Sequence, residues 1–108
     1  MKNQEIVLKI IKHIDSILKY TYNINYKEFK NNNMMIEACV FNLSQVGELV
    51  NKLDKEYMSE HQEIPWFKIR GLRNRIVHDY EGVNPNLIWE IIDTDIKILR
   101  KQLMEIIK

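Results

Sequence analysis

Apolar residues recur at intervals of three and four along most of this 108-residue chain, and this periodicity limits the fold more than any other feature. Near the N-terminus they occupy six such positions: Val7, Ile10, Ile11, Ile14, Ile17 and Leu18. An α-helix gathers this spacing on one face, whereas a half-buried strand needs strict alternation. The pattern predicts an amphipathic helix over about residues 3–21.

The same spacing returns downstream and predicts a second long helix to about residue 57, capped by Asn32 or Asn33. Gly47 lies inside it and lowers helix propensity by about 1 kcal/mol relative to alanine. A glycine at this position indicates that another backbone packs closely against the helix. The intervening residues 21–33 lack sustained periodicity, so we expect a connection with one helical turn near residues 26–29.

Two further helices are predicted in the second half of the chain. Pro65 suits the first turn of a third helix, and Gly82 is a plausible end for it. The buried stripe of this helix consists of Trp66, Ile69, Leu72 and Ile76. Asn84 followed by Pro85 is a start signal for a fourth helix, which the apolar spacing extends to the C-terminus.

Four helices, each with one apolar stripe, can bury those stripes only against one another. The expected fold is therefore all-α, an antiparallel four-helix up-down bundle formed by residues 1–108 as a single domain. Three glycines and two prolines are few for a many-stranded β protein, which needs frequent turns. The sequence shows no internal repeat or low-complexity linker.

Charge and the apolar pattern exclude several classes. Sixteen basic and fifteen acidic residues give a formal net charge of +1, so the chain lacks the overall positive field of a protein that coats nucleic acid. No apolar run approaches the roughly 18 residues of a membrane span, and no signal peptide opens the chain. A cytoplasmic protein without membrane contact is expected.

Metal, cofactor and thiol chemistry are not expected. His13, His61 and His78 are too far apart for a short zinc motif, and no glycine-rich phosphate loop is present. Cys39 cannot form a disulfide within a chain that has one cysteine, and its apolar neighbours make it a poor nucleophile.

The strongest local concentration of charge lies just before His78. It consists of four cations within eight residues: Lys68, Arg70, Arg73 and Arg75. A solvated helix face is the common explanation of such a cluster. A surface that contacts the phosphates of RNA is the alternative.

The string Arg73-Asn74-Arg75-Ile76-Val77-His78-Asp79-Tyr80 contains an Arg-x4-His-x-Tyr motif with a polar residue directly after the arginine. Here the chain resembles the HEPN superfamily and, within it, the HepT toxins. The resemblance spans nearly the whole chain and also takes in Gly47-Glu48, Trp66, Ile69, Val83 and Trp89.

This resemblance implies a HEPN-like helical fold and a ribonuclease toxin of a prokaryotic toxin–antitoxin pair. It implies that Arg73 and His78 carry RNA cleavage, in a homodimer whose motif helices line a shared cleft. It also implies that Tyr80 is adenylylated by a partner antitoxin, a minimal nucleotidyltransferase. On spacing alone, a core tyrosine that closes the helix is the better interpretation of Tyr80.

The two residue types suit metal-independent RNA cleavage. A histidine, with a reference pKa of about 6.5, exchanges protons near neutral pH, and an arginine holds a phosphate through two hydrogen bonds. On one ideal helix, however, Arg73 and His78 lie about 140° apart around the axis, so they do not converge. Two subunits that face each other would bring both groups to one phosphate.

Three further residues are candidates for supporting roles. On a continuous helix Asn74 shares the face of His78 and can orient its ring. Glu48 either pairs with an arginine of the motif or is a solvated carboxylate, and Asp79 is polar surface or orients the motif. The alternatives to an enzyme are a noncatalytic helical dimer that presents Tyr80 to a nucleotidyltransferase and, less well supported, a helix-turn-helix DNA binder.

Overall fold

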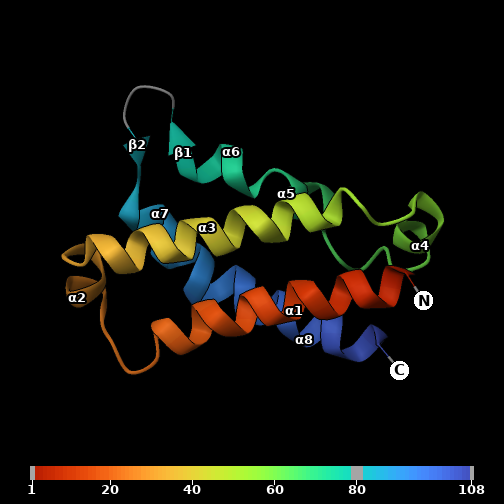
Figure 1. The fold of residues 1–108 in the computed structure, drawn as a ribbon, viewed down its shortest axis with the longest axis horizontal. Helices are drawn as coiled ribbons and strands as arrows, with labels where there is room; N and C mark the ends of the chain where they lie inside the picture. The colour runs from red at the N-terminus through yellow and green to blue at the C-terminus, as the bar shows by residue number, and fades with distance from the viewer. Residues whose placement is uncertain (1, 79–81, 108) are drawn as a thin grey trace.

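Two long antiparallel helices, α1 (Lys2–Tyr20) and α3 (Asn33–Val50), lie side by side and form the largest packed pair (Figure 1). The computed structural model describes residues 2–78 and 82–107. Its principal extents are 41 × 31 × 20 Å. The helix predicted over about residues 3–21 is confirmed to within one residue at each end.

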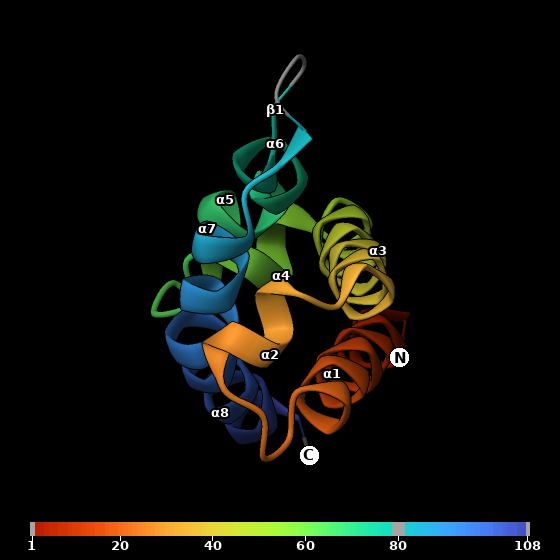
Figure 2. The same ribbon diagram turned by 90° about the vertical axis from the view of Figure 1, so that its left-hand side faces the viewer.

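The remaining described elements are α2 (Tyr26–Lys30), α4 (Lys55–Ser59), α5 (Trp66–Arg70), α6 (Leu72–Ile76), β1 (Val77–His78), β2 (Gly82–Val83), α7 (Pro85–Glu90), the π-helical η1 (Ile91–Ile96) and α8 (Lys97–Ile106). The predicted all-α class is confirmed. The third and fourth predicted helices are divided, into α5–α6 and α7–η1–α8, so the molecule is less regular than the expected four-helix bundle. Figure 2 shows α1 and α3 on one side of the molecule and α7 and α8 on the other.

The core consists of the apolar stripes that the spacing predicted. Val7, Ile10, Ile14 and Ile17 of α1 are completely buried. The stripe predicted for the third helix is also buried: Trp66, Ile69, Leu72 and Ile76. Each such side chain contributes about 1.5–3 kcal/mol when it leaves water.

Asparagines fix where three of the helices begin. Asn25 and Glu28 form a reciprocal capping box at α2, which confirms the helical turn expected in this connection. The side-chain oxygens of Asn32 and Asn84 accept hydrogen bonds from backbone N–H groups three residues later, at 3.0 and 3.3 Å. Pro85 is the first residue of α7, as predicted.

The prediction that the second helix reaches residue 57 is wrong. α3 ends at Val50, and the chain turns before α4 begins. The turn is attached to α1: the backbone N–H of Asp54 donates to Asn3 Oδ1, and Asn3 Nδ2 donates to Asp54 Oδ2, both at 3.1 Å. Leu53 is buried within the turn, so the core accepts it without a continuous helix.

The prediction that the third helix carries the whole motif to Gly82 is also wrong. α6 ends at Ile76, and the backbone then forms an antiparallel pair in which Val77 lies opposite Val83 and His78 opposite Gly82. Gly82 has a φ of +75°, a conformation that glycine adopts readily. Its conformational freedom serves the strand pair rather than the end of a helix.

The last predicted helix contains a segment that its sequence does not reveal. Residues 91–96 form the π-helix η1, with wider turns than the α-helices on either side. The buried residues Ile92, Ile96 and Leu99 keep intervals of four and three across it, so the apolar spacing resembles that of one uninterrupted helix.

The close backbone approach predicted at Gly47 is confirmed. A Cβ at this position would lie 3.2 Å from the carbonyl oxygens of both Ile69 and Arg70, so α5 packs directly on α3 here. Gly71 differs, because the nearest atoms to its Cβ would be 3.7 and 3.9 Å away.

We expect Gly47→Ala to lower the free energy of unfolding by about 1–2 kcal/mol, since overpacking against two carbonyl groups outweighs the gain in helix propensity. Gly71→Ala is the matched control and should leave stability unchanged or raise it slightly. Urea denaturation followed by circular dichroism measures both. Equal stabilities for the two variants would contradict the close approach.

Candidate functional site

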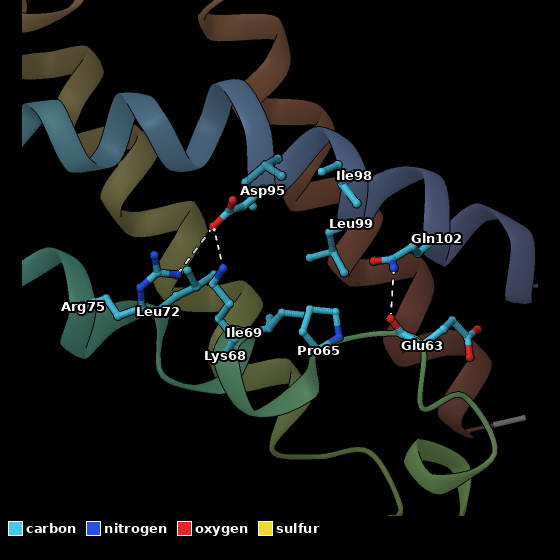
Figure 3. Close-up of a pocket in the computed structure, with 11 residues that line it drawn as sticks. Glu63, Pro65, Lys68, Ile69, Leu72, Arg75, Asp95, Ile98, Leu99 and Gln102 are labelled. Carbon is cyan, nitrogen blue, oxygen red and sulfur yellow. Dashed lines mark hydrogen bonds and ion pairs between the residues drawn. The ribbon is translucent and has the colours of Figure 1, made fainter.

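In the basic cluster of α5 and α6, two of the four cations form ion pairs with one acidic residue from another helix. Lys68 Nζ and Arg75 Nη1 each lie 3.6 Å from the same oxygen, Oδ2 of Asp95 (Figure 3). Asp95 belongs to η1, so the π-helical segment carries the carboxylate that meets two of the predicted phosphate ligands. These two cations are therefore partly neutralised by an internal partner.

Arg70 is held in a different way. Its Nη2 lies 3.9 Å from Met58 Sδ, and its guanidinium carbon lies 5.2 Å from the centre of the Phe67 ring. Its Nε is buried and has no hydrogen-bond partner within the described residues. Arg70 thus packs beside sulfur and an aromatic ring rather than beside a carboxylate.

Arg73 is the member of the cluster that stays exposed and unpaired within the part of the chain that the structure describes. It lies on α6 with its side chain exposed, and no described residue forms a hydrogen bond or ion pair with it. Asn74 beside it is also exposed and makes no such contact in the described part of the chain. An unpaired guanidinium can offer a phosphate two parallel hydrogen bonds.

His78 lies beyond the end of α6, in β1, where the structure describes its backbone alone. Arg73 and His78 therefore do not share one helix, and the angle expected for residues five apart on a helix does not apply to them. For the same reason Asn74 and His78 do not share a helical face. Asp79 and Tyr80 lie outside the described residues.

Glu48 is exposed on α3 and forms no ion pair with any residue that the structure describes. Of the two interpretations of Glu48, the solvated carboxylate agrees with these contacts. The neighbouring Gly47 lies at the close contact between α3 and α5. In the Gly47-Glu48 pair, the glycine therefore makes the contact between helices, and the glutamate makes no ion pair with a described residue.

A pocket of about 250 Å³ lies between α5–α6 and η1–α8. Figure 3 shows the Asp95 ion pairs at one end and the hydrogen bond from Gln102 Nε2 to the carbonyl oxygen of Glu63, 3.1 Å long, at the other. Apolar side chains line the space between them: Pro65, Ile69, Leu72, Ile98 and Leu99. No sequence pattern indicates this pocket, because its two sides come from helices about 30 residues apart.

A reactive thiol and a metal centre are the other kinds of site considered for the described residues. Cys39 is completely buried, and burial raises the pKa of its thiol to about 11, so the reactive thiolate is disfavoured at neutral pH. Across residues 2–78 and 82–107 no group of three or more His, Cys, Asp or Glu side chains is placed to hold a metal ion. No helix in these residues is long and apolar enough to cross a membrane.

Comparison with known proteins identifies the family. The model of the family described as "Ribonuclease HepT-like" matches residues 10–106. The chain belongs to the HepT-like ribonuclease family. The predicted resemblance and the predicted enzyme class, an endoribonuclease, are thereby confirmed for this HepT-like chain.

Curated relatives of the HepT-like chain carry corresponding names. A protein named "Putative RNase" from Caldanaerobacter subterraneus subsp. tengcongensis is 33% identical over 92% of this chain and 88% of its own length. Another protein with that name, from Methanocaldococcus jannaschii, is 33% identical over 92% of this chain and 82% of its own length. A protein named "Probable ribonuclease HepT" from Thermococcus cleftensis is 26% identical over 84% and 83%. No solved structure matches the chain.

Proposed function

We propose that this chain is the toxin of a toxin–antitoxin pair and cleaves RNA without a metal, with Arg73 binding the phosphate and His78 transferring protons. The observation that carries the proposal is the state of the basic cluster. Lys68 and Arg75 share Asp95, whereas Arg73 is exposed and has no partner among the described residues. The site thus retains an unoccupied cation five residues before a histidine.

The proposed reaction is attack of the ribose 2′-oxygen on the adjacent phosphorus. The imidazole of His78 accepts the 2′-hydroxyl proton, and the bond from phosphorus to the 5′-oxygen breaks as the new bond forms. The protonated imidazole of His78 then gives a proton to the departing 5′-oxygen, which leaves a 2′,3′-cyclic phosphate, a 5′-hydroxyl and a neutral imidazole. Arg73 stabilises the charge that grows on the non-bridging oxygens.

We further propose that two copies of the chain form the cleft. The strand pair that carries His78 lies beyond α6 at the outer edge of the molecule, away from α1 (Figure 2). A second copy against this edge would bring two Arg73 and two His78 residues to one strand of RNA. Sedimentation that finds a persistent monomer with full cleavage activity would contradict this arrangement.

The proposed control of the toxin is adenylylation of Tyr80 by a minimal nucleotidyltransferase. The modification adds a nucleotide with its phosphate charge two residues after His78, where it would compete with RNA for Arg73. Tyr80→Phe should still cleave RNA but should resist silencing when the nucleotidyltransferase and its nucleotide are added. Intact-mass spectrometry and a cleavage assay together test this, and enzymatic silencing of Tyr80→Phe would contradict it.

The deciding experiment for the function uses purified, unmodified protein and a labelled single-stranded RNA in the presence of EDTA. We expect cleavage at multiple turnovers. If the RNA stays intact while a nucleotidyltransferase modifies Tyr80, the noncatalytic alternative is correct. Specific binding of duplex DNA without RNA cleavage would support the DNA-binding alternative instead.

A further inference from the structure

A second groove, of about 650 Å³, runs between α4 and α5 and shares Pro65 and Lys68 with the pocket beside Asp95. Its lining combines apolar side chains with three cations, Lys55, Lys68 and Arg70. No carboxylate is among the described residues that line it. Lys68 already pairs with Asp95, so Lys55 and Arg70 are the two cations of this lining that have no carboxylate partner among the described residues, and they favour an anionic ligand.

Phe67 stands at this groove with 83% of its surface exposed. Its neighbour Trp66, by contrast, is buried and donates its indole N–H to the carbonyl oxygens of Met58 and His61, at 3.1 and 3.0 Å. A phenylalanine that lies open beside a fixed tryptophan contributes little to the core. Such a ring offers a flat surface on which a nucleotide base can stack.

Arg70 provides the second, independent observation. Its guanidinium lies 5.2 Å from the Phe67 ring centre, and its buried Nε lacks a hydrogen-bond partner among the described residues. A buried donor without an acceptor is unfavourable and rare in native structures. A phosphate or base oxygen in the groove would supply the missing acceptor.

Phe67 of this groove and Arg73 lie on consecutive helices, α5 and α6. The backbone N–H of Gly71 donates to the carbonyl oxygen of Phe67 at 3.2 Å, and that of Arg75 donates to the carbonyl oxygen of Gly71 at 3.1 Å, so the two helices meet at Gly71. A nucleotide on Phe67 and a phosphate on Arg73 would therefore lie on neighbouring helices of one segment of the chain.

We infer that this groove binds one unpaired nucleotide of the RNA substrate, with its base stacked on Phe67 and an oxygen accepting from Arg70. The inference rests on the proposed function for the identity of the ligand as RNA. It assigns selection of single-stranded RNA to α5, since a base inside a duplex is not available to stack on a side chain.

The test measures binding rather than cleavage. A fluorescently labelled 2′-O-methyl oligoadenylate, which has no free 2′-hydroxyl, is titrated with the full chain, and its anisotropy gives Kd. Phe67→Leu should weaken binding about 5- to 100-fold, the effect expected for loss of one stacked base. Phe67→Tyr should bind like the unaltered protein. Phe41→Leu is the matched control, since Phe41 is 57% exposed on α3, outside the groove.

Unchanged binding by Phe67→Leu would overturn the inference, as would equal losses in Phe67→Leu and Phe41→Leu. A shift in oligomeric state on Phe67→Leu, seen by sedimentation without RNA, would instead assign the groove to a protein interface. The proposed function can fail separately. If the chain binds the oligonucleotide through Phe67 but leaves ordinary RNA intact, nucleotide binding in the groove is supported and RNA cleavage by this chain is contradicted.

Discussion

Replacing His78 with glutamine should lower kcat for RNA cleavage by at least about 100-fold, the contribution expected of a group that transfers protons in the transition state. Glutamine keeps a polar side chain of similar reach but cannot exchange a proton near neutral pH. The backbone of His78 pairs with Gly82 irrespective of the side chain, so the strand pair should persist. Single-turnover cleavage at saturating protein measures the loss.

The matched control for this variant is His61→Gln. His61 is partly buried beside Tyr57 and lies 4.0 Å from Glu63, in a part of the chain that the proposed reaction does not use. Its replacement should leave kcat within about 3-fold of the unaltered protein. Full activity of His78→Gln would show that cleavage takes place at another site or comes from a contaminant.

Arg73→Gln should lower kcat/KM by about 100-fold or more, because it removes the cation that binds the phosphate as charge develops. Arg75→Gln, the same change two residues away, should cost less than about 5-fold. Arg75 already shares Asp95 with Lys68, and after its removal Lys68 still pairs with that carboxylate. Cleavage assays on both variants at one ionic strength give the comparison.

Two other outcomes would change this interpretation. Equal losses in Arg73→Gln and Arg75→Gln would indicate that the summed charge of the cluster, rather than one guanidinium, drives binding and catalysis. Full activity of Arg73→Lys would show that positive charge is sufficient and that the two-hydrogen-bond geometry of arginine is not needed.

Local signals in the sequence predicted local structure well. Asn84-Pro85 predicted the start of α7, and Gly47 predicted a close backbone contact that the structure places against α5. Both depend on one residue type and its nearest neighbours. The family resemblance likewise came from a short string, Arg73 to Tyr80, in a helical context.

The sequence was misleading where two structures satisfy the same pattern. Gly82 with a positive φ suits both the end of a helix and a strand pair, and pairing with β1 decided between them. The helix end at Val50 depends on a contact between Asn3 and Asp54, 51 residues apart, which no local pattern contains.

The membership of the candidate site stays a prediction, and its internal ion pairs could not be predicted from the sequence. The spacing singled out Lys68, Arg70, Arg73 and Arg75 as equivalent cations. Only the packing of η1 against α5 and α6 shows that Asp95 engages two of them, and only burial shows that Nε of Arg70 lacks an acceptor among the described residues. Differences among like-charged neighbours arise from tertiary contacts.

The most direct measurement of the central claim compares two oligonucleotides of one sequence, in EDTA, once the cleaved position has been mapped. One is RNA throughout, and the other has a single 2′-deoxynucleotide on the 5′ side of that linkage. We expect the RNA to yield a 2′,3′-cyclic phosphate and the substituted strand to stay whole at that linkage. Equal cutting of both strands, or cutting that requires a divalent metal ion, would contradict proton transfer by His78 to and from a ribose hydroxyl held beside Arg73.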